Sequence, residues 1–242
     1  MKSSISIIIG ILLLTGWSST AVGQFVEEKR LENREVATEL QNMHLVVRDA
    51  RNNDLLNTDI IVKGLNPRKP VVFEEVSDTT LEIRHYRLYT ISCIEAGYMY
   101  FANKFWPDEK QVHEEEILLE PLRVGLKTDV RDITFLGDKT QIYPRSKPAL
   151  DELIAFLELN PNVKLKVIGH VNGPDGSRSQ RFYEKASIER AQAVVDYLIA
   201  SGIEENRLVA FGAGNSEMLY PDPQTDWQNE ANRRIQIEII SL

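Results

Sequence analysis

Two hydrophobic patterns divide the chain, and the first gives way to the second near residue 121. Between residues 43 and 121, apolar and polar residues alternate in short runs, which is the spacing of β-strands with one buried face. Turn-forming residues separate these runs. The predicted strands cover residues 45–48, 59–63, 80–84, 88–93 and 116–119. Because no helical period lies among them, we predict a small antiparallel β-sandwich over residues 43–121.

Helical and strand patterns alternate after residue 121. In the first helix apolar residues recur every three to four positions, and Ser146 is expected to cap its start. Gly202 is expected to cap the end of the second helix. The predicted helices cover about 146–160 and 181–201, and the predicted strands cover 132–136, 164–168, 207–211 and 234–239. The whole chain is therefore predicted to be α+β, with a two-layer α/β sandwich at residues 126–242.

The first 23 residues predict a secretory signal peptide. Lys2 precedes an apolar run at residues 5–14, and the small residues Ala21 and Gly23 mark a cleavage point. A retained membrane anchor is the alternative, but a spanning helix needs about 20 apolar residues. No cysteine lies at the cleavage point, so lipid attachment there is excluded. Residues 24–42 are polar and charged, and we predict a linker or a frayed first element.

Composition narrows the possible partners. The chain has 242 residues and a net charge of −8, so nucleic acid or an anionic membrane would gain no electrostatic attraction. Cys93 is the sole cysteine, which excludes an internal disulfide and a thiolate zinc site. Its apolar neighbours predict that Cys93 lies in the core.

Catalytic and metal-binding patterns are missing from the sequence. No serine or cysteine nucleophile comes with a suitable histidine and carboxylate, and the pair Gly212 and Gly214 lacks the further glycines of a phosphate loop. The histidines are scattered without metal-ligand spacing, at positions 44, 85, 113 and 170. We therefore expect neither an enzyme nor a cofactor or metal site.

The candidate site lies between residues 169 and 190. A polar loop rich in Gly, Pro and Asp follows a predicted buried strand and leads into the second helix, which carries Arg190. A guanidinium can bind a carboxylate through two parallel hydrogen bonds. Arg190 is therefore either a clamp for a charged ligand or a structural ion-pair partner of Asp175 or Glu189.

The order of motifs after residue 126 resembles the OmpA-like carboxy-terminal domain, by which many Gram-negative envelope proteins hold peptidoglycan. The motifs are Ile133-Thr134-Phe135, Leu150-Asp151-Glu152-Leu153, Asn160-Pro161, Ile168-Gly169-His170, Ala186-Ser187-Ile188-Glu189-Arg190-Ala191, Gly212-Ala213-Gly214 and Asn232-Arg233-Arg234-Ile235. The resemblance implies a βαβαββ order and a non-catalytic binding module.

The same resemblance implies a ligand, the diaminopimelate of the peptidoglycan stem peptide. Its carboxylate would pair with Arg190. The family's aspartate, which would pair with the ammonium, is here Asn172, and exchanging a charged for a neutral hydrogen bond costs about 1–2 kcal/mol. Asp175 is the candidate to replace that charge. The implied ligand-binding residues are Arg190, Asn172, Asp175, Gly173, Ser187 and Arg234.

Residues 43–121 resemble the carboxypeptidase regulatory-like (transthyretin-like) sandwich. The similarity rests on a strand that runs into Asp49 and a polar turn, and on a strand from Tyr89 that ends at Gly97-Tyr98. Such domains serve as spacers or docking units. Aromatic residues between 98 and 106 are expected to pack in the core rather than form an exposed patch.

These expectations combine into one hypothesis and one alternative. The hypothesis is an exported envelope protein in the periplasm that associates with peptidoglycan near the outer membrane or cell wall, with envelope proteins as further partners. The alternative is an envelope scaffold whose degenerate OmpA-like domain binds a protein instead. Residues 24–42 are too few for the strands of a transmembrane barrel, so we expect no barrel of its own.

Overall fold

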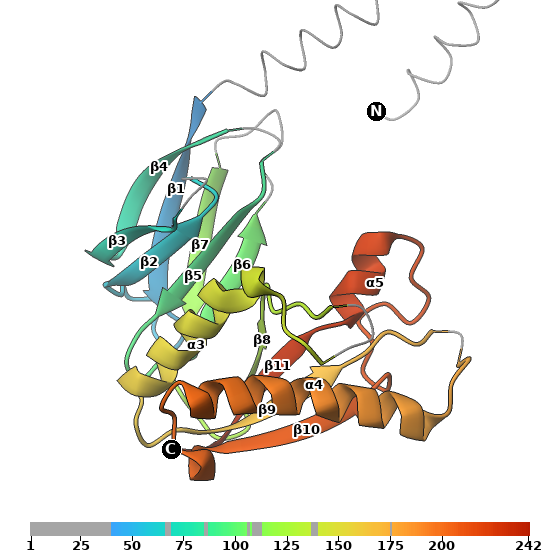
Figure 1. Ribbon diagram of the computed structural model, residues 1–242. Coiled ribbons are helices and arrows are strands. Elements are labelled where there is room, and N and C mark those ends of the chain that lie inside the picture. Colours follow the sequence, from blue (N-terminus) through green and yellow to red (C-terminus); the bar gives the residue numbers. More distant parts are fainter. Residues whose placement is uncertain are drawn as a thin grey trace, which may run out of the picture.

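The computed structural model describes residues 40–65, 69–84, 87–105, 107, 113–136, 140–174 and 176–242. Its strands form three sheets, and its longer helices cover one of them (Figure 1). The predicted signal peptide lies outside the described residues, as does the predicted linker apart from residues 40–42, which belong to the first strand.

The amino-terminal half is a β-sandwich, as predicted. Its strands are β1 (Leu40–Asp49), β2 (Thr58–Lys63), β3 (Val71–Val76), β4 (Asp78–Arg84), β5 (Tyr89–Ile94), β6 (Phe101–Phe105) and β7 (His113–Leu119). One sheet has the order β4-β1-β7 and the other β3-β2-β5-β6. The sandwich departs from a purely antiparallel arrangement, because β1 and β7 pair in parallel. Strands β3 and β6 were not predicted.

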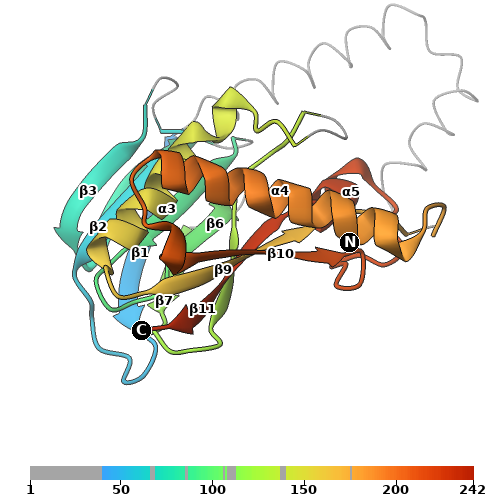
Figure 2. The same ribbon diagram turned by 60° about the horizontal axis from the view of Figure 1, so that its bottom comes forward.

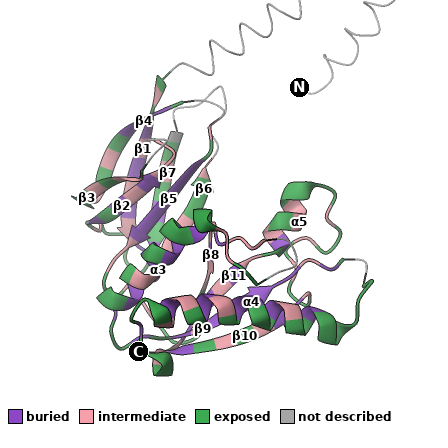
Figure 3. Ribbon diagram, viewed as in Figure 1, coloured by how far each residue is buried: buried purple, intermediate pink, exposed green. Residues whose placement is uncertain are grey.

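Buried residues lie along the strands of both sheets (Figure 3), and their side chains form one core between the sheets. Along β1, Met43, Leu45 and Val47 are fully buried and their neighbours are more exposed. Cys93 lies in this core, as predicted. The expected core packing of the aromatic residues is also confirmed for the described ones, since Phe101 and Phe105 pack against this core.

The carboxy-terminal half is an α/β sandwich. Its strands are β8 (Lys127–Val130), β9 (Lys164–His170), β10 (Leu208–Gly214) and β11 (Ile235–Ser241), and its helices are α3 (Lys147–Leu159), α4 (Gln180–Ala200) and α5 (Asp226–Asn232). Short 3-10 turns, η1 (Pro144–Ser146) and η2 (Glu205–Arg207), precede α3 and β10. The sheet order is β10-β9-β11-β8, with β9 and β10 parallel and β11 antiparallel to both of its neighbours.

Three expectations for this half are corrected. The first strand is β8 at 127–130 rather than 132–136, because the polar β8 is an edge strand held by hydrogen bonds to β11 alone. The short polar helix α5 is inserted between β10 and β11, so the observed order is βαβαβαβ. Ser146 precedes α3 without a side-chain capping bond, since its Oγ accepts a 2.9 Å hydrogen bond from the Thr134 backbone N–H.

Helix α4 lies along β9 and β10, and α3 lies between α4 and the amino-terminal sandwich (Figures 1 and 2). The predicted end of α4 is confirmed, because Gly202 adopts a φ of +103° that a side chain would oppose. Along α4, Ile188 is 43% exposed, while the neighbouring Ser187 is buried.

A polar cluster joins the two halves. Tyr100, at the sandwich end of the joint, is almost fully buried, and its hydroxyl donates a 2.9 Å hydrogen bond to Glu152 of α3. The other oxygen of Glu152 pairs with Nζ of Lys63 from β2 at 3.0 Å. Nearby, the Gly97 N–H donates to the side-chain oxygen of Asn160 at 2.8 Å. Because Tyr100 and Glu152 are buried, each depends on its partner across the joint.

Substituting Glu152 is expected to destabilise the joint. Glu152→Ala leaves the Tyr100 hydroxyl and the Lys63 ammonium buried without their shared partner, so the free energy of unfolding should fall by about 2–4 kcal/mol. Chemical denaturation measures the change. The control is Asp151→Ala, which removes an exposed pair with Lys147 and should cost about 0.5 kcal/mol or less. If the free energy of unfolding falls equally in the two variants, the structural role of Glu152 is contradicted.

Candidate functional site

The position of the site depends on how closely α4 approaches the sheet. A Cβ at Gly169 would lie 2.0 Å from the Ser187 carbonyl oxygen, and a Cβ at Gly212 would lie 2.6 Å from the Ile188 nitrogen. The buried Ser187 hydroxyl accepts a 2.9 Å hydrogen bond from the Gly214 N–H and donates one of 2.9 Å to the Glu184 carbonyl. Ser187, a predicted ligand residue, thus fastens α4 to β10.

Arg190 lies about one helical turn beyond Ser187 on α4. Arg190 is only 8% exposed, and its guanidinium carbon lies 5.4 Å from the centre of the Phe135 ring. Stacking on a ring face leaves the N–H groups of a guanidinium directed outward in its own plane. The side chain also lines a cavity of about 370 Å³.

The cavity around Arg190 is rich in positive charge. Its lining residues are Thr134, Phe135, Tyr143, Arg145, Arg190, Glu230 and Arg233. Arg145 donates from Nε to the Thr134 hydroxyl at 3.1 Å and lies over the Tyr143 ring at 4.7 Å. Arg233 pairs with Glu230 at 2.6 Å. Three guanidinium groups and one carboxylate therefore surround a space that is suited to an anionic group with an ammonium beside it.

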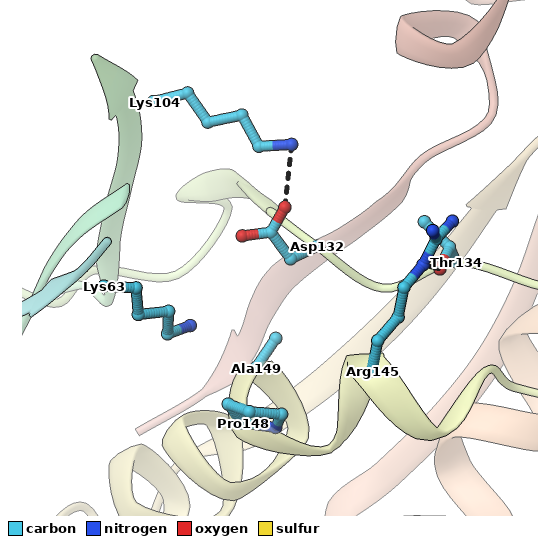
Figure 4. A pocket seen from close by; sticks show the side chains of 7 residues that line it. All are labelled: Lys63, Lys104, Asp132, Thr134, Arg145, Pro148 and Ala149. Carbon is cyan, nitrogen blue, oxygen red and sulfur yellow. Dashed lines mark hydrogen bonds and ion pairs between the residues drawn. The ribbon is translucent and has the colours of Figure 1, made fainter. Parts of the chain in front are cut away.

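A second cavity of about 370 Å³ lies at the joint between the two halves and shares Thr134 and Arg145 with the first (Figure 4). It is also lined by Lys63 of β2 and Lys104 of β6. Figure 4 shows Lys104 directed toward Asp132. Nζ of Lys104 pairs with Oδ1 of Asp132 at 2.7 Å. Lys63 pairs with Glu152. Because both lysines have carboxylate partners, we assign them to the joint rather than to the site.

The other predicted residues of the loop have different positions. Asn172 donates to the side-chain oxygen of Asn229 at 2.8 Å and accepts from the Asn232 side chain at 2.7 Å. It is not among the described residues that line the Arg190 cavity. Gly173 is buried against Tyr183, whose ring would lie 2.5 Å from an added Cβ. Asp175 lies outside the described residues.

The two adjacent arginines before β11 are directed to different places. Strand alternation predicts that one faces the ligand and the other points away, and the sequence favoured Arg234. In the structure Arg233 lines the cavity, whereas Arg234 pairs with Asp129 of β8 at 3.2 Å and donates to the Glu217 carbonyl. Arg233, rather than the predicted Arg234, is thus the arginine of this pair that lines the cavity.

Sequence reasoning missed most of the cavity lining. Tyr143 and Arg145 precede α3, and Glu230 belongs to α5, a helix whose seven residues have no apolar period. The one available signal was the pair of adjacent arginines at the start of the last strand. The other lining residues come from separate segments of the sequence and become neighbours only in the folded protein.

His170 ends β9 and is buried beside the loop. Neither ring nitrogen has a hydrogen-bond partner among the described residues. Burial, together with the nearby positive charge of Arg234, lowers the pKa of His170 to about 4. The ring is therefore neutral at physiological pH and is a structural group of the core. In the described part of the chain, no cluster of three metal-ligating side chains occurs.

The comparison with known families covers the part of the chain that holds this cavity. Residues 134–233 match the sequence model described as the OmpA family. The match covers less than half of the 242-residue chain. The matched segment contains Arg190 and all the other described residues that line the cavity. No helix among the described residues combines the length and apolar character needed to span a membrane.

Individual known proteins are similar to parts of this chain. Outer membrane protein A of Klebsiella aerogenes is 36% identical over 88 residues, which are 36% of this chain and 24% of that protein. The chain thus spans about a quarter of that relative. The periplasmic domain of Helicobacter pylori MotB aligns over 50% of this chain and 77% of its own, with 19% identity and a TM-score of 0.42. The peptidoglycan-associated lipoprotein of Burkholderia pseudomallei aligns over 46% and 88%, with 15% identity and a TM-score of 0.38.

The neutral His170 makes stability depend on pH. Its native pKa is below that of an unfolded histidine, so the unfolded state binds more protons, and the stability present above about pH 6.5 is lost as pH falls toward about 4. The loss should reach about 3 kcal/mol. Thermal unfolding of wild type and His170→Phe across this range measures it, and the variant should lack this component. The matched control, His44→Gln, should keep it. If stability falls with pH in parallel for wild type and His170→Phe, the assignment of His170 as the source of this pH dependence is contradicted.

Proposed function

We propose that the chain is a non-catalytic cell-envelope protein that associates with peptidoglycan through its OmpA family domain. The observation that carries the proposal is the cavity in which Arg190 lies beside Arg145, Arg233 and Glu230. Arg190 stands in the Ser-x-x-Arg-Ala stretch that the OmpA-like domain uses for ligand binding. The names of the relatives, an outer membrane protein and a peptidoglycan-associated lipoprotein, support the same location and ligand.

The ligand we propose is the diaminopimelate of the stem peptide. Its side chain ends in a carbon that bears both a carboxylate and an ammonium. A carboxylate that enters the cavity meets guanidinium groups that can form charge-assisted hydrogen bonds, which contribute about 1.5–3 kcal/mol each. The excess of positive charge in the lining favours the carboxylate end.

The remaining parts of the chain receive roles that fit this function. The signal peptide would export the chain to the periplasm, and the amino-terminal sandwich would act as a spacer or a docking unit for other envelope proteins. The buried cluster of Tyr100, Glu152 and Lys63 supports a fixed spacer, because it ties the sandwich to α3.

One observation favours the scaffold alternative. Asn172, in place of the family aspartate, is bound to two other asparagines and does not line the cavity. In the alternative the domain has lost its ligand and binds a protein instead.

Co-sedimentation with purified diaminopimelate-type peptidoglycan tests the proposal. Wild type should pellet, and Arg190→Ala should weaken the affinity by about 10- to 100-fold, because a charge-assisted contact is lost. The matched control is Arg181→Ala, an exposed arginine on the same helix, which should bind as wild type does. Circular dichroism checks that each variant is folded. If folded wild type stays in the supernatant, peptidoglycan binding is excluded and the scaffold alternative is favoured.

A further inference from the structure

Three asparagine side chains form a continuous chain of hydrogen bonds beside the cavity. Asn232 donates from Nδ2 to Oδ1 of Asn172 at 2.7 Å, and Asn172 donates from Nδ2 to Oδ1 of Asn229 at 2.8 Å. Asn232 is fully buried, and Asn172 is partly buried. These hydrogen bonds join the loop after β9 to helix α5.

Backbone groups fix the direction of this chain at both ends. At one end, Asn232 accepts from the Tyr220 N–H at 2.9 Å and donates to the Tyr220 carbonyl at 2.8 Å. At the other end, Asn229 donates to the Thr225 carbonyl at 3.1 Å. A backbone N–H only donates and a carbonyl only accepts, so the oxygen and nitrogen of each amide are assigned. Asn172 must accept from Asn232 and donate to Asn229.

An aspartate at position 172 could not make both bonds. A carboxylate accepts from Asn232 as well as an amide does, but its second oxygen would face the oxygen of Asn229. To avoid this, Asn229 would have to rotate and give up the Thr225 carbonyl. Asn172 therefore links the other two asparagines through hydrogen bonds that only an amide can make. These bonds hold α5 against the end of β9.

The helix held in this way carries a carboxylate into the Arg190 cavity. Glu230 follows Asn229 directly, and it is the acidic side chain among the described lining residues. We propose that Glu230 is the binding partner of the ligand's ammonium group and that Asn172 is a positioning residue that holds α5. The ligand class is a zwitterion with adjacent carboxylate and ammonium groups. This inference rests on the proposed function.

The present partner of Glu230 does not prevent this role. The Glu230–Arg233 contact uses Oε1, and its two side chains are 62% and 45% exposed. Such exposed pairs contribute little to stability. A carboxylate has about four acceptor positions, so an ammonium can bind beside Arg233 without displacing it. Arg190 and Glu230 then hold the two charges of one ligand from α4 and α5.

Two soluble peptides test the assignment. The first is N-acetyl-L-alanyl-γ-D-glutamyl-meso-diaminopimelate, which keeps the side-chain ammonium. In the second that amine is acetylated, so its charge is removed. Calorimetric titration should show that Glu230→Gln weakens binding of the first peptide about tenfold and leaves the weaker binding of the second unchanged. Glu158→Gln on the exposed face of α3 carries the same change in charge and should bind both peptides as wild type does.

Asn172→Asp provides an independent readout. It should not tighten binding of the first peptide, and its melting temperature should fall by about 2–4 °C, because the chain of amides is broken. If Glu230→Gln binds like wild type, or Asn172→Asp gains affinity, the assignment is overturned while the proposed function stands, provided that Arg190→Ala is weakened. If folded wild type binds neither the peptides nor peptidoglycan, both proposals are overturned.

Discussion

The close contact between α4 and the strands β9 and β10 is the constraint on which the site depends. Gly169 and Gly212 leave room for the helix backbone, and Ser187 ties that backbone to Gly214. With the helix set so near the sheet, Arg190 is carried inward at its buried face rather than into open solvent. Any added side chain at either glycine would push the helix outward and move Arg190 with it.

The walls of the cavity come from separate parts of the chain. Arg145 and Tyr143 come from the segment before α3, and Glu230 and Arg233 come from α5 and its end. The same Arg145 also lines the cavity at the joint, where the sandwich packs on α3. The geometry of the site is therefore linked to the joint through Arg145, although the sandwich contributes no residue to the lining of the Arg190 cavity among those described.

Apolar periodicity accounts for the part of the fold that the sequence could predict. It located α3, α4 and β9 because each has a continuous buried face, and the alternation in β1 and β2 predicted the sandwich. The edge strand β8 (Lys-Thr-Asp-Val) and the seven-residue α5 have little apolar sequence, so tertiary hydrogen bonds determine them.

Prediction of the site is also limited, because tertiary contacts rather than a sequence pattern bring most of its residues together. Arg190 belongs to a recognisable helical motif and was found. Arg145, Glu230 and Arg233 become neighbours only after folding, and the role of Asn172 depends on amides from distant positions. The resemblance of residues 43–121 to the carboxypeptidase regulatory-like sandwich stays a prediction beyond the sandwich architecture itself.

We propose that Arg190 binds the side-chain carboxylate of diaminopimelate. The most direct test compares two stem peptides that differ only in that carboxylate, one with diaminopimelate and one with lysine at the third position. Nuclear magnetic resonance titration would follow the Arg190 Nε–H signal. We expect a saturable shift with the diaminopimelate peptide and at least about tenfold weaker binding of the lysine peptide. Equal affinity for both peptides, or an Arg190 signal that does not move, would contradict it.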